Sequence, residues 1–237
     1  MLIALIALAM IFIYTVGATA FIRLTGIGIY KRGGTENKIA LTFDDGPDPF
    51  YTPLLLELLE RHRVKATFFV VGTKARAHPA IIQDIHKRGH VIGIHNDQHI
   101  SNWLLPPLLF KKQLRKAQAA ILEITGVAPL YYRPPWGHFN LFTLIASRRL
   151  HIIMWTAIPG DWKEDVDPSR LAHLLKQARS KGAVITLHDS GTTFGADKHA
   201  PKNTLQALEL FLSDKSSSNY SFVTVHDLFS EAIRSGE

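Results

Sequence analysis

The chain opens with a long apolar stretch. Residues 2–22 carry no charged side chain, and a helix of this length, at about 1.5 Å per residue, covers roughly the hydrocarbon thickness of a bilayer. The pattern predicts one transmembrane helix, with residues 1–23 as the anchor. A cleaved signal peptide is the alternative, since Ala18-Thr19-Ala20 resembles a cleavage site, although no Lys or Arg precedes the apolar run.

The pattern of apolar and polar positions changes after this stretch. Glycines punctuate residues 24–35, which indicates a linker. From Glu36 onward, short apolar runs rich in β-branched or aromatic residues alternate with helix-like segments. The runs predict strands at 39–43, 66–71, 91–94, 130–132, 152–156, 183–187 and 222–225.

Several helix ends are readable between these strands. Thr52 followed by Pro53 is typical of an N-cap and first helical position, and predicts a helix over 54–62. Gly89, Gly126 and Gly182 each stand where a glycine would end a helix. Alternating helices and continuously apolar strands favour a parallel sheet covered by helices, so we expect an α/β fold that closes as a complete or incomplete (β/α) barrel over residues 36–235.

Composition narrows the classes of partner. Hydrophobic residues make up 46% of the chain and charged residues 20%, which is typical of a folded protein. The absence of cysteine means that any metal site must use His, Asp or Glu. The net charge of +7 favours an anionic partner, but no cluster of Arg and Lys is interleaved with aromatic residues, so we expect no nucleic acid partner.

The orientation of the predicted anchor stays open. The nearest positive charges are Arg23, Lys31 and Arg32, and all of them follow the apolar stretch. By the positive-inside rule they would hold the domain in the cytoplasm.

Chemically competent side chains follow the ends of different predicted strands. They are Asp44, Asp45, His95, Arg133, Asp161 and His188. Each has an ordinary explanation by itself, as a helix cap or a hydrogen-bonded polar residue. Barrel enzymes carry their active sites at the carboxyl ends of their strands, so together these residues predict one site.

A metal ion fits part of this set. His95 and His99 are separated by three residues in a predicted loop, and the adjacent acids Asp44 and Asp45 need a reason for their mutual repulsion, which a divalent cation supplies. Two imidazoles and one carboxylate leave coordination positions open, as in catalytic rather than structural sites. Such ligands suit zinc and are compatible with cobalt, nickel or iron.

The sequence over residues 36–235 resembles the polysaccharide deacetylase family, the NodB-homology carbohydrate esterases. Five ordered segments carry the resemblance: Thr42-Phe-Asp-Asp-Gly-Pro47, His95-Asn-Asp-Gln-His99, Arg133-Pro-Pro-Trp-Gly137, Asp161-Trp162 and Leu187-His188-Asp189. The resemblance implies a distorted (β/α)7 barrel, related to the TIM barrel, and one divalent ion, expected to be zinc, with cobalt or nickel as alternatives. The implied metal ligands are Asp45, His95 and His99.

The resemblance also implies catalytic roles, and these agree with what amide hydrolysis requires. Asp44 would be the general base, held by Arg133, and His188 the general acid, because the unperturbed pKa of histidine is about 6.5. A backbone N–H near Trp136 would join the metal in stabilising the oxyanion. The expected walls of the pocket are Trp162 and Leu187, although both fit the protein core equally well.

The chain departs from the family pattern at two positions. Asn96 stands where family members carry Ser or Thr, and we expect its amide to brace the same loop. Ile158 replaces the first acid of the fourth segment, so only Asp161 remains to orient His188. Asp97, between the two metal histidines, is interpreted as a solvated loop residue rather than an additional ligand.

One apolar segment is not explained by the shared motifs. Residues 100–110 contain a Pro-Pro pair and many leucines, and Lys111 and Lys112 follow them. The segment either folds back over the barrel or dips into the membrane interface, with Trp103 and the lysines at the level of the headgroups.

Three functions remain in view. The first is removal of N-acetyl groups from N-acetylhexosamine units of a cell-wall or related polysaccharide, by a single-pass membrane protein whose domain lies outside the cytoplasm. The second is deacylation of a lipid-linked sugar at the membrane. The third is a non-catalytic, metal-binding or carbohydrate-binding relative.

Overall fold

The computed structural model describes residues 1–235, and its strands form one curled sheet. The strands are β1 (Ile29–Tyr30), β2 (Lys38–Asp44), β3 (Thr67–Val70), β4 (Val91–Ile94), β5 (Tyr131–Tyr132), β6 (His151–Ile153), β7 (Ala183–His188) and β8 (Ser221–Val223). Their order is β1-β6-β5-β4-β3-β2-β7, with β8 also paired to β2, and each of these pairs is parallel. The seven predicted strands therefore form close to their expected limits.

The open edge of the sheet is bridged by backbone contacts. Just beyond β6, the N–H of Thr156 donates to Val184 O of β7 at 2.9 Å, and the N–H of Thr186 donates to Ala157 O at 3.0 Å. This contact brings β6 and β7 together, so the sheet curls into the distorted barrel that the sequence predicts. Ile29 and Tyr30, within the predicted linker, form β1 and pair with β6.

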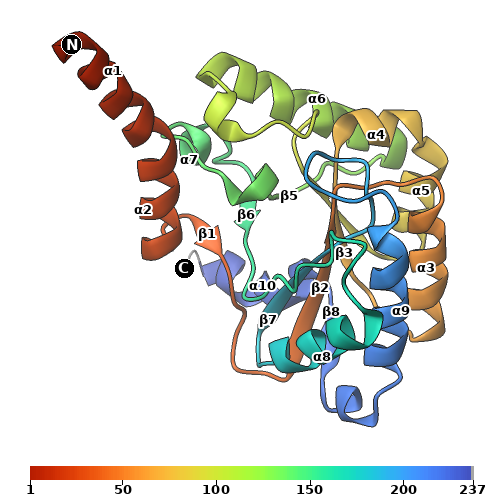
Figure 1. The fold of residues 1–237 in the computed structure, drawn as a ribbon. Helices are drawn as coiled ribbons and strands as arrows, with labels where there is room; N and C mark the ends of the chain where they lie inside the picture. The colour runs from red at the N-terminus through yellow and green to blue at the C-terminus, as the bar shows by residue number, and fades with distance from the viewer. Residues whose placement is uncertain (236–237) are drawn as a thin grey trace.

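Helices lie outside the sheet, and all of them except α1 pack around the barrel (Figure 1). They are α1 (Leu2–Phe12), α2 (Ala18–Thr25), α3 (Tyr51–Arg61), α4 (Gly72–Ala77), α5 (Pro79–Lys87), α6 (Pro107–Thr125), α7 (Thr143–Ala146), α8 (Pro168–Ala178), α9 (Ala200–Leu212) and α10 (Val225–Ser235). Neighbouring helices touch in the order α8, α9, α3, α5 and α6. Shorter helical turns are η1 (Ile13–Gly17, π-helical), η2 (Asn102–Leu104), η3 (Pro135–Gly137) and η4 (Lys215–Asn219).

The core lies between the strands and these helices. Ile39, Leu41 and Phe43 of β2 are fully buried, as are Phe68 and Phe69 of β3. Continuous burial is typical of strands that are covered on both faces, and it agrees with the continuous apolar runs in the sequence.

The predicted start of the first barrel helix is wrong. Helix α3 begins at Tyr51, before the expected cap Thr52, and Asp48 Oδ1 accepts the backbone N–H groups of Phe50 and Tyr51, both at 2.9 Å. The Thr52 hydroxyl donates instead to Asp189 Oδ2 at 2.5 Å. The hydroxyl that local sequence assigns to the helix cap therefore forms a tertiary hydrogen bond instead.

The glycine predictions hold in part. Gly126 ends α6 in the left-handed conformation, and Gly89 follows the end of α5 with φ of 77°. Gly182 does not end a helix, because α8 stops at Ala178. It occupies a turn before β7 where a Cβ would lie 2.5 Å from Gly33 O, so both its positive φ and this close approach require glycine.

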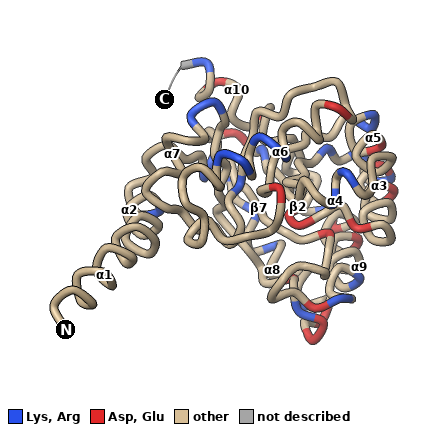
Figure 2. The backbone as a smooth tube through the Cα atoms, turned by 90° about the horizontal axis from the view of Figure 1, so that it is seen from above, with Lys and Arg blue, Asp and Glu red and all other residues tan. Residues whose placement is uncertain are grey.

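The apolar N-terminus forms one continuous helix, Leu2–Thr25, which is long and apolar enough to cross a membrane by length and composition. In Figure 1 α1 projects away from the barrel, beside α7. Figure 2 shows that α1 carries no Lys, Arg, Asp or Glu. This helix therefore has the composition of a membrane span or of a signal sequence.

Candidate active site

The residues singled out from the sequence meet at the carboxyl ends of the strands. Asp44 is the last residue of β2, with Asp45 directly after it, and His188 is the last residue of β7. His95 follows β4, and Arg133 follows β5. Parallel pairing places these strand ends at one edge of the sheet, so four segments far apart in the sequence contribute to one site.

Asp44 and Arg133 form a buried ion pair. Arg133 Nη1 donates to Asp44 Oδ1 at 2.7 Å and to Thr42 Oγ1 at 2.8 Å, and its Nε donates to Ile153 O at 3.0 Å. Arg133 is fully buried and its guanidinium lies 4.2 Å from the centroid of the Phe69 ring. Burial lowers the pKa of the guanidinium, while Asp44 acts in the opposite direction. The arginine therefore fixes one oxygen of Asp44 and leaves the carboxylate at the floor of the site.

Asp45, His95 and His99 form a cluster whose ligand atoms lie within 4.8 Å of one another. Asp45 Oδ1 lies 3.1 Å from His99 Nε2 and 3.3 Å from His95 Nε2. This oxygen is buried and accepts no hydrogen bond from any described residue. A buried carboxylate oxygen facing two imidazole nitrogens without a hydrogen bond is the environment that a cation would complete, so these residues fit a divalent metal ion.

The histidine contacts define which ring nitrogen faces this cluster. His95 Nδ1 lies 2.8 Å from Arg133 O, and only a protonated nitrogen can donate to a carbonyl oxygen. Its Nε2 therefore keeps a free lone pair directed at Asp45. Burial lowers the pKa of His99 although Asp45 opposes it. Burial favours the neutral form of Asp45, but the two imidazoles outweigh it and hold the pKa of Asp45 well below its usual range.

His188 and Asp161 form a second buried pair. Asp161 Oδ1 lies 2.8 Å from His188 Nδ1, and Asp161 Oδ2 accepts the His188 backbone N–H at 2.8 Å and the Thr204 hydroxyl at 3.1 Å. Burial lowers the pKa of His188, but Asp161 outweighs it and raises the pKa to about 10. The imidazole is therefore positively charged at neutral pH, with its Nε2 free of Asp161.

A cavity of about 350 Å³ joins these groups. Asp44, Asp45, His95, His99 and His188 form its polar lining, and its other walls are Pro134, Trp136, Trp155, Ile158, Trp162 and the segment 193–196. The expected wall Trp162 lines the cavity. Leu187 does not, because it is fully buried in the core. Ile158 thus places an apolar side chain where the family pattern carries an acid.

Trp136 adopts an uncommon backbone conformation at the mouth of the cavity. Its φ is 54°, in the left-handed region, and its ring lies 4.2 Å, centroid to centroid, from that of His99. A bulky residue rarely adopts this conformation without a constraint from its surroundings. The turn places the indole against the imidazole of His99.

The loop between the metal histidines is braced as the sequence suggests. Asn96 Nδ2 donates to Ile100 O at 2.9 Å and to Asn102 Oδ1 at 3.0 Å, and its Oδ1 accepts from the Tyr132 hydroxyl at 3.0 Å. Its φ of 60° also suits asparagine, which tolerates the left-handed region. The interpretation of Asp97 as solvated is wrong: it is buried and pairs with Arg76 at 2.6 Å, outside the metal cluster.

Sequence reasoning missed three polar residues next to the site, Lys74, Asp189 and Thr193. Asp189 is buried against Gly46, and burial raises its pKa to about 7. Lys74 Nζ donates to Asp45 O and to Ser190 Oγ, both at 2.8 Å, and the Thr193 hydroxyl donates to Asp45 Oδ2. Asp189 belongs to a quoted motif, so its position gave a signal, whereas Lys74 and Thr193 lie in segments without a recognisable pattern.

The chain belongs to the polysaccharide deacetylase family, whose family model matches residues 31–155. The resemblance inferred from the five motifs is therefore confirmed. Among curated proteins, the chain is 32% identical over 203 residues to the peptidoglycan-N-acetylglucosamine deacetylase PgdA of Listeria monocytogenes, covering 86% of this chain and 41% of that protein. It is 32% identical over 218 residues to a peptidoglycan-N-acetylglucosamine deacetylase of Bacillus cereus, covering 86% of this chain and 93% of the relative.

Solved structures confirm the fold. The crystal structure of the Bc1960 peptidoglycan N-acetylglucosamine deacetylase matches with a TM-score of 0.80 and 28% identity, over 89% of this chain and 96% of that one. The distorted (β/α)7 barrel is thus the fold of this protein. The chain spans less than half the length of the Listeria relative.

Proposed function

We propose that this protein is a metal-dependent hydrolase that removes N-acetyl groups from N-acetylhexosamine units of a cell-wall or related polysaccharide. The observation that carries the proposal is one cavity lined by a cluster fitting a metal ion and by Asp44 and His188, which are held from behind by the buried partners Arg133 and Asp161. The printed names of the relatives, which are peptidoglycan deacetylases, support the substrate class.

Asp45, His95 and His99 would hold the ion, and their mixed nitrogen and oxygen ligands favour zinc, with cobalt or nickel as alternatives. When bound, the ion would polarise the acetyl carbonyl and lower the pKa of a water molecule toward about 7. The Nδ1 donor of His95 to Arg133 O keeps its other nitrogen aimed at the ligand position. The Asn96 contacts hold the intervening loop in the shape that brings both histidines to Asp45.

Asp44 is the proposed general base. It lies at the same cavity floor as the metal cluster but is not one of its ligands, so its free oxygen can take a proton from the attacking water. Arg133 donates to its other oxygen and so fixes the orientation of the carboxylate.

His188 is the proposed general acid, and Asp161 orients it. The Asp161 carboxylate stabilises the protonated imidazole and occupies Nδ1, which leaves Nε2 to protonate the departing amine. Asp44 and His188 are held by different partners, so one can accept a proton while the other donates one. This division meets the two proton transfers that amide hydrolysis requires.

The remaining cavity walls suit an acetylated sugar. Trp162 and Ile158 provide an apolar surface for the acetyl methyl, and the half-exposed indole of Trp136 offers a face on which a sugar ring can stack. The backbone N–H of Trp136 would support the developing oxyanion, because Pro135 has no N–H and that of Gly137 donates to Pro134 O at 2.9 Å.

Activity is favoured over a non-catalytic role because the two departures from the family pattern leave the machinery in place. Asn96 supplies the bracing contacts expected of the loop, and Asp161 pairs with His188 although Ile158 replaces the first acid. We also propose that the N-terminal helix anchors the chain as a single span with the domain outside the cytoplasm, where a cell-wall substrate lies.

The test is acetate release from an N-acetylglucosamine tetramer by the full chain loaded with zinc or cobalt, beside Asp44→Asn and His188→Ala. We expect metal-dependent release that falls by about 10²–10⁴-fold in each variant, while both variants still bind one equivalent of metal. Absence of release from this tetramer by the metal-loaded protein would contradict a polysaccharide substrate. Release that persists in Asp44→Asn would contradict the assignment of the base.

A further inference from the structure

A second cavity continues from the active site. It is a groove of about 490 Å³ that shares His99, Trp136 and Phe194 with the catalytic cavity. Its other lining residues are Ile100, Ser101, Trp103, Leu104 and His138. No Lys, Arg, Asp or Glu is among the lining residues, so the groove is suited to a hydrocarbon group attached to a substrate in the neighbouring site.

The N-terminal helix is fastened to the wall of this groove. Trp103 Nε1 donates to Thr19 Oγ1 at 2.8 Å, and Trp103 stacks on His138 with ring centroids 3.8 Å apart. Thr19 also donates to Phe139 O and accepts the Phe139 N–H, both at 2.9 Å. The Tyr14 hydroxyl donates to Leu105 O at 2.8 Å. These hydrogen bonds therefore tie the N-terminal helix to the barrel segments that carry the groove.

The docked part of the helix belongs to the same uncharged stretch, residues 2–22, that is long and apolar enough to span a membrane. The free part, α1, has 11 residues with none buried, and covers about 16 Å at a rise of about 1.5 Å per residue. The hydrocarbon layer is roughly 30 Å thick. The uncharged stretch continues through η1 to Ile22 of α2, so a span made of this stretch keeps η1 and much of α2 within the layer, together with the barrel segments on which they dock.

The side chains at this level are compatible with lipid. The Tyr14 and Thr19 hydroxyls find partners inside the protein, as polar groups in a hydrocarbon layer must. Around the docked helix lies a set of exposed apolar side chains, here called the apolar rim: Leu104, Leu108, Leu109, Leu141, Phe142 and Ile145. Leu104 and Leu108 are 74% and 79% exposed. Exposing a contiguous set of apolar side chains to water is unfavourable, so such a patch usually marks a surface that contacts lipid or a partner.

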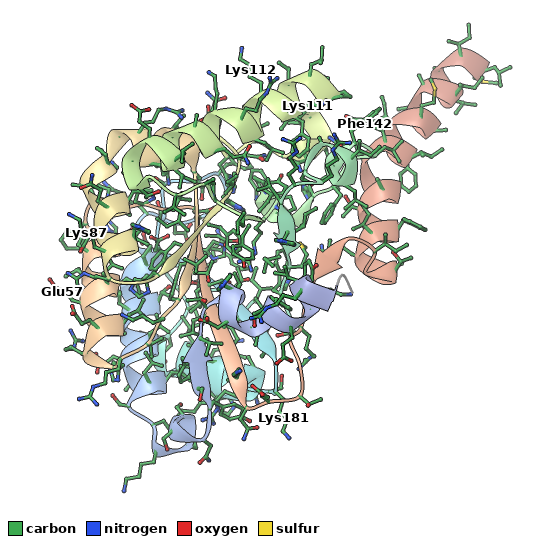
Figure 3. All side chains as sticks on the ribbon, turned by 180° about the vertical axis from the view of Figure 1, so that it is seen from behind. Glu57, Lys87, Lys111, Lys112, Phe142 and Lys181 are labelled. Carbon is green, nitrogen blue, oxygen red and sulfur yellow. The ribbon has the colours of Figure 1, made fainter. Side chains whose placement is uncertain are left out.

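Basic side chains border the apolar rim. Lys111 and Lys112 follow Leu108 and Leu109 on α6, and Figure 3 shows both lysines on the outer side of α6, with Phe142 between α6 and the N-terminal helix. Lysines next to an inserted apolar surface are placed to contact anionic headgroups. The apolar rim thus matches the hydrocarbon layer of a membrane, and the lysines match the headgroup layer.

We infer that the N-acetylated sugar reaches this site while attached to a membrane lipid, with the hydrocarbon chain of that lipid lying in the groove between Trp103 and Phe194. The inference rests on the proposed function and specifies its substrate class. The apolar rim is inserted in the outer part of the bilayer, so the groove opens where a lipid chain emerges and the sugar enters the catalytic cavity beside it.

The test compares two substrates with the same acetylated sugar. The full chain, loaded with zinc in nonionic detergent, is given either hexadecyl N-acetylglucosaminide in mixed micelles with phosphatidylglycerol or the soluble N-acetylglucosamine tetramer. We expect kcat/KM for the hexadecyl substrate to be at least about tenfold higher, the scale of one well-buried hydrocarbon segment. Dilution of the micelle surface with detergent should lower that rate without changing the rate on the tetramer.

A groove variant and a matched control complete the test. Leu104→Asp should lower the ratio of the two kcat/KM values by about tenfold, whereas Leu122→Asp, an exposed leucine on the far part of α6, should leave the ratio within about twofold. Equal kcat/KM values in the unmodified protein, or a ratio unaffected by Leu104→Asp, would overturn the lipid-linked substrate. Release from the tetramer alone would keep the hydrolase and overturn this inference, and no release from either substrate would overturn both.

Discussion

The floor of the active site and the apolar rim lie side by side but are built in opposite ways. At the floor, charged side chains are buried and nearly every one is held by a partner, as in the Asp44–Arg133 and Asp161–His188 pairs. At the rim, leucines are exposed, and the few polar groups that meet the N-terminal helix are paired within the protein.

This difference indicates that the floor carries out the chemical step, whereas the rim controls how substrate reaches the site. Buried charges at the floor fix the positions and protonation states of the proposed catalytic side chains. A change there should therefore alter the reaction on any substrate. Exposed apolar side chains at the rim contribute little to the reacting geometry, so a change there should alter only how substrate reaches the site. The following predictions test that separation, from the largest expected effect to the smallest.

Removal of a metal ligand should have the largest effect. We expect His95→Ala or His99→Ala to lose metal and to lower kcat by about 10³-fold or more, since the bound ion supplies several kcal/mol of charge stabilisation. Metal content and acetate release measure the two losses. His86→Ala, on an exposed surface, is the control and should keep both. Retention of stoichiometric metal in either ligand variant would contradict the assigned cluster.

Loss of the buried arginine should chiefly affect folding. Arg133→Met leaves Asp44 buried without its cation, so the free energy of unfolding should fall by about 3–5 kcal/mol. Urea denaturation measures it, and Arg148→Met, at an exposed position, should change it by less than about 0.5 kcal/mol. An equal, small effect of both changes would show that the Asp44–Arg133 pair is not important for stability.

The Asp161–His188 pair should set the alkaline limit of activity. Asp161 raises the pKa of His188 to about 10, so the protonated acid is available until the pH approaches that value. In Asp161→Asn the alkaline limb of the kcat profile should move to lower pH by at least about one unit. An unchanged alkaline limb would mean that another group limits the reaction.

The same pair should contribute to stability in a defined pH range. Because the pKa of His188 is raised above the ordinary value of 6.5, its contribution is fully present below pH 6.5 and is lost as the pH rises toward about 10. Unfolding free energies of Asp161→Asn and the unmodified protein should therefore differ most below pH 6.5 and converge at alkaline pH.

The smallest effect is expected where the helix meets the rim. Thr19→Val removes the hydroxyl shared by Trp103 and Phe139, which should lower the unfolding free energy in detergent by about 1–2 kcal/mol. Release from the soluble tetramer should stay within about twofold. Thr25→Val, whose hydroxyl contacts only its own helix and the next turn, is the control. A large loss of activity on the tetramer would mean that rim and floor are coupled.

Much of the fold and of the site was predictable. The strands were found because each is a short apolar run between turn residues, and the site residues because they directly follow those runs. Asn96 was expected to brace its loop, and its contacts agree. Asp97 was not predictable, because its partner Arg76 lies on α4, and nothing in the local sequence indicates that the two side chains meet.

The sequence by itself determined the order of strands and helices, the five motifs and the apolar N-terminus, because local periodicity and residue type carry that information. Only the tertiary structure decided that the Thr52 hydroxyl bonds Asp189 instead of capping the helix, and that Leu187 lies in the core rather than in the pocket. It also decided that the N-terminal helix docks on the wall of a groove beside the site. The physical reason is the same in each case. A side chain takes the partner that folding brings within reach, and contacts between residues 84 or 137 positions apart leave no periodic trace in the chain.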